Sequence, residues 1–278
     1  MVDDGSTDES AAVLATYVDR GVKVITEKCG SAAKARNRAW AEATGDYIKF
    51  FDADDLINPE FIALQMARVA GRTDAVASSE WGRFYGDDLT TFRLNPQSVW
   101  RDMEATDWLV EAWREARPMM QPGMFLIPAS ILRKAGGWDE SLTLIDDFEF
   151  FTRVLCHTSE VLFTPGAVLH YRSGLSGSLS GQKSRKAVES AFKSLTKGAE
   201  HLLARRADTE TKRSCANLFQ DFIYTYYPDH ADLLHAMKAR ITELGGSDLP
   251  PDGPPRFQKL CRLLGWRMAR RIKQLLKS

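Results

Sequence analysis

The stretch YIKFFDADD, residues 47–55, decides the fold of this chain. Its apolar half, residues 47–51, predicts a buried strand, and the carboxylates of Asp52, Asp54 and Asp55 follow at once. Open α/β folds bind ligands at the carboxyl ends of their strands, and carboxylate oxygens are ligands for hard divalent cations. The stretch therefore predicts a site for a metal and a phosphate. A solvated turn is the alternative for an isolated Asp-x-Asp, because Asp is common in turns.

Helices and strands alternate on both sides of this stretch. Apolar spacing and helix-forming residues predict helices at 10–20 and 31–44, a strand at 22–25, and a helix that opens at 58–60. Further strands are predicted at 74–81 and 124–128, and further helices at 96–117, from Ala129, and at 146–156. Short alternating elements are typical of parallel βαβ units. The predicted fold class is α/β, a doubly wound mixed sheet flanked by helices.

The composition limits what the chain binds. Its 278 residues are enough for one large domain or two small ones, and 37 Lys and Arg balance 37 Asp and Glu. No global field favours nucleic acid, and we expect none as a partner. Four dispersed cysteines lack the spacing of a zinc site or a disulfide framework, and the acidic start differs from a signal peptide. Because no window is long enough to span a bilayer, we expect a reduced, cytoplasmic protein.

Four separated motifs occur in order: VDDGSTD at 2–8, GSAAKARN at 30–37, GDYIKFFDADD at 45–55, and GGWDE at 136–140 with Asp146-Asp147 after it. This set resembles the family 2 glycosyltransferases, inverting enzymes of the GT-A fold, over roughly residues 2–180. Each motif alone is weak evidence, whereas the set is specific. The resemblance implies a GT-A-like fold and a nucleotide-sugar donor, most commonly a UDP-sugar.

The resemblance implies that Asp3 and Asp4 bind the nucleotide base and that Arg36 lies near the nucleotide. A carboxylate accepts hydrogen bonds from the ring N–H of uracil or guanine, and the glycine turn lets the backbone approach. An arginine fork suits a phosphate or carbonyl oxygen. The open alternatives are helix capping by Ser6 or Asp8 and a solvated basic helix face around Arg36.

For the Asp-x-Asp motif, the resemblance implies that one acid faces the ribose and the other coordinates Mn²⁺ or Mg²⁺ at the diphosphate. We favour Asp54 as the metal ligand and retain Asp52 for either role, with Asp55 as a structural residue. A Lewis acid suits this chemistry because negative charge develops on the departing nucleoside diphosphate.

Asp147 is the predicted general base. An inverting transfer needs one carboxylate to take the proton of the acceptor hydroxyl as that oxygen attacks the anomeric carbon. The family carries Glu-Asp where this chain has Asp146-Asp147, so the second acid is retained. The alternative is that both acids only stabilise the start of a helix. The preceding GGWDE loop favours the catalytic role.

Residues 170–181 resemble the end of the family's catalytic domain. A Gly/Ser loop at 174–181, with Arg172, Lys183 and Arg185 nearby, is expected to close over the diphosphate. His170 is predicted to be a structural histidine rather than a metal ligand.

Beyond residue 183 the sequence predicts helices alone, with a flexible linker at 245–255. Residues 256–278 contain eight Lys and Arg and no acid, with apolar residues at helical spacing around Trp266. They predict a basic amphipathic helix interrupted by Gly265. Such a helix suits an anionic membrane surface and a lipid-linked acceptor, and docking of its apolar stripe on the protein body is the equal alternative.

Members of this family normally begin with a strand, a helix and a second strand before the Asp-Asp-Gly motif, but here only Met1 and Val2 precede Asp3. We expect either a truncated start or a remnant with impaired donor binding, because a lost first strand exposes a sheet edge.

These observations predict three parts: a nucleotide-sugar-binding part at 1–98, an acceptor-binding and catalytic part at 99–182, and a helical extension at 183–278. The predicted function is metal-dependent, inverting transfer of a sugar to a saccharide or lipid-linked acceptor of a cell-envelope polysaccharide. One rival is a non-catalytic homologue. A second rival is a haloacid-dehalogenase-type phosphatase, which would carry Thr or Val where Leu56 stands.

Overall fold

The computed structural model describes residues 1–175 and 184–275 and divides into two compact units. Unit 1 comprises Met1–Ala105 and Met120–Gly198, and unit 2 comprises Thr106–Met119 and the described residues from Ala199 onward. The functional division at residues 98 and 182 stays a prediction.

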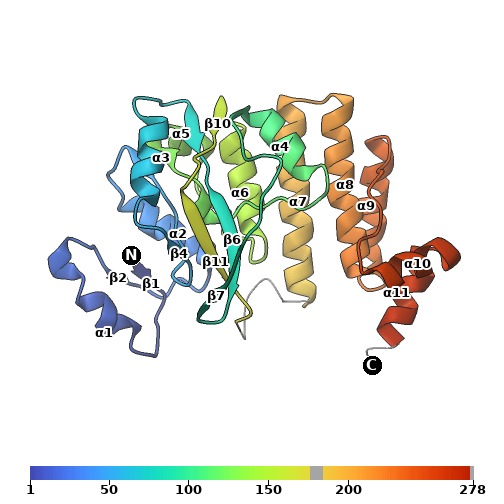
Figure 1. Cartoon of the computed structure of the whole chain (residues 1–278), viewed down its shortest axis with the longest axis horizontal. Coiled ribbons are helices and arrows are strands. Elements are labelled where there is room, and N and C mark those ends of the chain that lie inside the picture. Colours follow the sequence, from blue (N-terminus) through green and yellow to red (C-terminus); the bar gives the residue numbers. More distant parts are fainter. Residues whose placement is uncertain (176–183, 276–278) are drawn as a thin grey trace. The chain divides into compact units, whose positions relative to one another are not determined.

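The N-terminal part of unit 1 is a parallel βαβ arrangement, as predicted (Figure 1). β1 (Val2–Asp3) pairs with β2 (Ile25–Thr26), and the short helix α1 (Ser10–Ala15) lies between them in sequence. The helix predicted at 10–20 breaks after Ala15 into a 3₁₀ turn, η1 (Val18–Arg20), that ends at Gly21 with φ 82°. α2 (Ala32–Ala41) follows, and the Ser31 hydroxyl caps it by accepting from the backbone N–H of Lys34.

The sheets of unit 1 are mixed. β3 (Tyr47–Ile48) runs antiparallel to β9 (Ile127–Pro128), and a bridge between Ala77 and Leu126 joins β9 to β5 (Ala75–Ala77). β5 is parallel to β10 (Glu160–Leu162), which is antiparallel to β8 (Met103–Glu104). A second sheet has the order β4 (Leu56–Ile57), β11 (Val168–Ser173), β6 (Glu80–Tyr85) and β7 (Asp88–Leu94), with only β6 and β11 parallel.

Several predicted boundaries are wrong. The strand at 47–51 ends at Ile48, and the segment 74–81 divides between β5 and β6. The helix predicted at 96–117 is only α4 (Ala105–Trp113), because β8 precedes it. The helices α3 (Phe61–Val69), α5 (Ala129–Ala135) and α6 (Asp146–Leu155) lie where the sequence predicts them, and a 3₁₀ turn, η2 (Pro122–Met124), precedes β9.

An aromatic cluster forms the core next to the acidic loop that begins at Asp52. Phe50 contacts Trp138 and Phe150 edge-to-face at centroid distances of 5.3 and 5.5 Å, while Trp138 stacks on Phe150 at 3.9 Å. All three side chains are buried, and each such ring pair contributes about 0.5–1.5 kcal/mol beyond its buried area. The cluster fixes α6 and the loop before it against the end of β3.

The described residues after 183 are helical, as predicted. α7 (Arg185–Arg205) belongs to unit 1 as far as Gly198, where a Cβ would lie 2.4 Å from the ring of Phe148. α8 (Thr209–Tyr226), α9 (Ala231–Glu243), α10 (Pro255–Leu264) and α11 (Trp266–Leu275) follow. Across the described ranges, none of the helices has the length and apolar character needed to cross a membrane.

The single basic helix predicted at 256–278 is wrong, because α10 and α11 are separate. Gly265 lies between them with φ 76°, a backbone conformation that residues with a Cβ rarely adopt.

Candidate functional site

The loop before α6 places Asp146 and Asp147 at the start of that helix. Its last residue, Ile145, has φ 50° and ψ 36°, a left-handed conformation that is unfavourable for a β-branched residue. α7 holds this loop: the Ser190 hydroxyl accepts from Leu144 N at 3.0 Å, and the Ser194 hydroxyl donates to Ile145 O at 2.6 Å. The strained backbone is thus maintained next to the predicted base.

Arg36 on α2 joins two of the predicted acidic motifs. Its Nη2 donates to Asp52 Oδ1 at 2.8 Å, and its Nη1 donates to Asp146 Oδ2 at 3.1 Å. The guanidinium lies over the Trp138 ring, 4.4 Å from its centroid. All three charged side chains are at most one-third exposed, so salt screens these two ion pairs less than it screens pairs on the surface. Residues 36, 52 and 146, far apart in sequence, therefore form one charged cluster.

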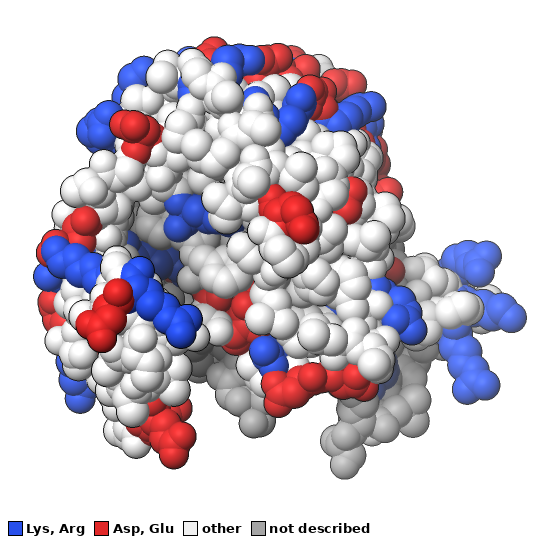
Figure 2. Space-filling model, turned by 60° about the vertical axis from the view of Figure 1, so that its left-hand side comes forward, with Lys and Arg blue, Asp and Glu red and all other residues white. Residues whose placement is uncertain are grey.

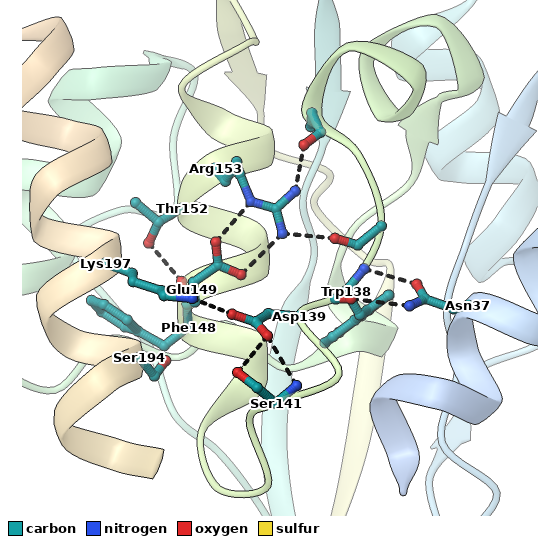
Figure 3. Close-up of polar contacts among 12 residues, drawn as sticks. Asn37, Trp138, Asp139, Ser141, Phe148, Glu149, Thr152, Arg153, Ser194 and Lys197 are labelled. Atoms are coloured by element: carbon teal, nitrogen blue, oxygen red, sulfur yellow. Dashed lines mark hydrogen bonds and ion pairs between the residues drawn. The ribbon is translucent and has the colours of Figure 1, made fainter. Parts of the chain in front are cut away.

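Asn37, the neighbour of Arg36, fixes the loop that carries Trp138 (Figure 3). Its Oδ1 accepts from Trp138 N at 2.8 Å, and its Nδ2 donates to Trp138 O at 3.0 Å and to Glu140 at 2.9 Å. Gly137 is required here because a Cβ would lie 2.8 Å from Asn37 Oδ1. Asn37 thus orders the backbone of the loop at residues 136–140.

A second anchor for the same loop lies on α6 (Figure 3). Arg153 forms a bidentate ion pair with the buried Glu149, at 2.7 and 3.0 Å, and donates to the carbonyls of Ala135 and Gly137. On the other side, Lys197 of α7 donates to Asp139. This network was not predicted from the sequence, although the (i, i+4) spacing of Glu149 and Arg153 on a predicted helix was a usable signal.

The two acids at the start of α6 differ electrostatically. Burial, together with the charge of Asp146, raises the pKa of Asp147 to about 7 against the opposing effect of Arg36. Burial also raises the pKa of Asp146, although Arg36 opposes this shift. A carboxyl group that titrates near pH 7 has the proton affinity that suits a general base. This raised pKa is compatible with the role predicted for Asp147.

The acidic loop after β3 contains one exposed and one buried carboxylate. Asp54 is exposed, whereas Asp55 is buried and accepts from Arg172 N at 2.9 Å and from the Gln121 amide. Burial, together with the charges of Asp54 and Asp52, raises the pKa of Asp55 to about 7. Asp55 thus ties the loop to β11, while Asp54 presents its carboxylate to solvent.

Arg172 of β11 lies beside this loop, but its donors bind protein groups. Its Nε donates to Asp54 O at 2.6 Å, and its Nη1 donates to Gly86 O at 3.0 Å and to Asp87. Of its predicted companions, Arg185 pairs with Glu189 at 2.6 Å, while residues 176–181 and Lys183 lie outside the described residues. His170 packs its ring 4.2 Å from Phe92, and burial lowers its pKa.

Asp3 and Asp4 shape the turns near β1. Asp3 is buried and accepts from Ser6 N at 3.0 Å, which lowers its pKa. Asp4 accepts from Gly30 N at 2.8 Å and from Cys29 N, so it fixes the loop that leads into α2. Through this loop, Asp4 is connected to the helix that carries Arg36.

The donor set fits a divalent cation that arrives with a phosphate ligand. Among residues 1–175 and 184–275, no group of three or more His, Cys, Asp and Glu side chains forms a complete metal site. Asp54 is exposed, and Asp52 has one oxygen paired with Arg36. Mg²⁺ is commonly bound by one or two carboxylates together with substrate phosphates and waters, and this arrangement matches that pattern.

Figure 2 shows the surface on the side where the N-terminal elements lie in Figure 1. This face is hollowed, with basic side chains inside the hollow and acidic side chains along its lower edge. A concave surface with both signs of charge suits a ligand that brings phosphates and a cation together.

Comparison with known proteins places this geometry in context. Residues 1–136 match the family model described as "Glycosyl transferase family 2". The chain is 26% identical over 181 residues to "Probable glycosyltransferase YdaM" of Bacillus subtilis (strain 168). The aligned segment covers 60% of this chain and 41% of that protein. The chain spans less than half the length of the curated relatives it matches.

Two solved structures have a similar fold. S. aureus TarS 1–349 in complex with UDP-GlcNAc has a TM-score of 0.59 at 17% identity, covering 87% of this chain and 78% of that one. GalNAc-T7 with UDP, GalNAc and Mn²⁺ has a TM-score of 0.51 at 14% identity, covering 97% and 51%. At these identities the likeness concerns the fold alone, and it confirms the predicted GT-A-like class.

Proposed function

We propose, on the premise that the chain belongs through residues 1–136 to the family 2 glycosyltransferases, that it transfers a sugar from a nucleotide-sugar to an acceptor hydroxyl with inversion. The observation that carries the proposal is the Arg36 bridge, which brings Asp52 after β3 next to Asp146 at the start of α6. A donor-binding motif and a base-bearing motif thus meet at one guanidinium. UDP is the favoured nucleotide because both similar solved structures were determined with UDP or UDP-GlcNAc.

In this proposal the donor lies along the acidic loop and the N-terminal turns. Asp3 and Asp4 face the base, and Asp52 faces the ribose, with Arg172 holding the loop that presents Asp54. Asp54, with Asp52, holds Mn²⁺ or Mg²⁺, which when bound stabilises negative charge on the departing diphosphate.

Asp147 acts on the acceptor. Its carboxylate takes the proton of the acceptor hydroxyl while that oxygen forms a bond to the anomeric carbon and the bond to the diphosphate breaks. The nucleoside diphosphate leaves with the electron pair of that bond. Asp146 is paired with Arg36, so Asp147 is the acid that remains available for the proton.

The acceptor in this proposal is a saccharide or lipid-linked sugar of a cell-envelope polysaccharide, which suits a cytoplasmic protein at the membrane face. This finer assignment is supported by the basic C-terminal helices, because a lipid-linked acceptor is presented at an anionic surface.

Calorimetric titration of the purified chain with UDP, GDP and dTDP, each with and without Mn²⁺, tests the proposal. We expect one nucleotide to bind in a metal-dependent way, and Asp54→Ala to weaken that binding at least ten-fold. Asp19→Ala, at an exposed acid of η1, is the matched control and should bind normally. If the folded protein binds no nucleotide, the non-catalytic rival is correct. If Asp54→Ala binds as the wild type does, the metal role of Asp54 is lost.

A further inference from the structure

The apolar residues of the C-terminal helix pair divide into two sets. One set packs within unit 2: the Trp266 ring lies edge-to-face with Tyr224 and Tyr227, at centroid distances of 4.9 and 5.1 Å. Phe257 and Ala269 are also buried. Arg270 also donates a hydrogen bond to Thr225 O at 3.0 Å. Together these contacts dock the helix pair on α8. Docking therefore uses only part of the predicted apolar stripe.

The other set is exposed around the turn at Gly265. Leu263, Leu264 and Met268 are 80%, 52% and 49% exposed. Arg262 and Arg267, at the two ends of this turn, are exposed as well. We call these five residues the basic corner. Each Å² of apolar surface left in water lacks about 25 cal/mol of the free energy that burial would provide. Adjacent exposed apolar side chains of this kind mark an interaction site.

All charged side chains on α10 and α11 are cationic. Arg256, Lys259 and Arg271 are exposed, and no Asp or Glu occurs from residue 256 to the end of the chain. Apolar tips framed by cations match a bilayer surface, where the tips enter the acyl boundary and the cations meet anionic headgroups. A nucleic-acid backbone would satisfy the cations and leave the apolar tips in water.

We propose that the basic corner binds the surface of an anionic lipid bilayer. The inference rests on the exposed faces of α10 and α11 alone. It goes beyond the proposed transfer reaction, and because it is measured without nucleotide, its failure would leave sugar transfer standing and remove only the support for a lipid-linked acceptor.

Flotation of the full chain with vesicles tests the proposal. We expect binding to vesicles of phosphatidylglycerol and phosphatidylcholine, and at least ten-fold weaker binding to pure phosphatidylcholine. Raising the salt concentration should weaken the binding without abolishing it, because the apolar contact is not screened.

Two pairs of matched variants locate the contact. Arg262→Gln with Arg267→Gln should weaken vesicle binding about 30-fold, since each cation near the surface contributes about five-fold. Lys212→Gln with Lys238→Gln removes the same charge from exposed positions on α8 and α9 and should change binding less than two-fold. Leu264→Glu should also weaken binding at least ten-fold, whereas Leu89→Glu, at a leucine 51% exposed on β7, should not. Thermal melting verifies that each variant is folded.

The proposal would be overturned by equal losses in both members of a variant pair, by equal binding to phosphatidylcholine alone, or by displacement of the vesicles by a low concentration of duplex DNA. Absence of binding by the wild-type chain at low salt would overturn it as well.

Discussion

Asp147 is the residue on which the proposed chemistry depends, and its titration gives the first prediction. Transfer should rise with pH and level off above about pH 7, because the base must be ionised and burial raises its pKa to about 7. Asp147→Asn should lower the transfer rate by about 10²–10⁴-fold while donor binding stays within about two-fold. The pH profile of kcat/KM and a donor titration measure both. Normal turnover by the variant would remove Asp147 from the mechanism.

The same substitution has a stability signature of defined sign. The folded-state pKa of Asp147 lies above the ordinary value of 3.8, so its ionisation costs the folded state stability as pH rises from about 4 to 7. Asparagine does not titrate, and the melting temperature of Asp147→Asn relative to wild type should therefore increase over this range and stay constant above it. A difference that does not change with pH would contradict the raised pKa.

Candidate residues that belong to recognisable motifs could be identified from the sequence, whereas the contacts between them could not. Asp52, Asp54, Arg36 and Asp147 belong to recognisable motifs. The role of Asn37 as a clamp on Trp138 depends on a contact across 101 positions, which no local pattern encodes. Sequence alone therefore indicated the candidate site residues, but not that Arg36 links two of the acids.

At the scale of elements, α6 is held by a buried ion pair that gives a second prediction. Arg153→Met should destabilise the protein by about 3–5 kcal/mol, because it breaks the bidentate ion pair of the buried Glu149 carboxylate. Urea unfolding measures the loss. Arg38→Met, which removes more solvent-accessible pairs with Glu27 and Glu42, is the matched control and should cost at most about 1 kcal/mol for each pair. Equal losses would show that the Arg153 network is no stronger than a surface pair.

Elements with strong local periodicity were predicted, and those that depend on distant partners were not. α5 and α6 begin where the sequence places them, since apolar spacing defines both helices locally and acids mark the first turn of α6. β10 and β4 have only three and two residues, and their pairing with β5 and β11 comes from far along the chain. The interruption at Gly265 was predicted from the residue type, whereas the complete separation of α10 from α11 depends on the backbone conformation of Gly265, which helical spacing does not reveal.

At the scale of the whole molecule, the net charge is zero, but the basic and acidic residues are unevenly distributed along the chain. Eight of the 37 basic residues lie in 256–278, which leaves 29 against 37 acids, a formal charge of −8, in the rest of the chain. At pH 7 and about 0.01 M salt, where screening extends over about 30 Å, the protein should bind both cation and anion exchangers. Arg262→Gln with Arg267→Gln should elute earlier from the cation exchanger only. Flow-through on both resins would indicate that the charges are evenly mixed.

The close approach of α7 to α6 at Gly198 also has a genetic consequence. Every missense change in a glycine codon adds a Cβ, and here that atom would meet the ring of Phe148, which directly follows Asp147 in the chain. Alleles of this codon would therefore disturb the base from a position that touches no substrate. A screen for conditional loss of function would recover codon 198 as readily as the acidic motifs themselves.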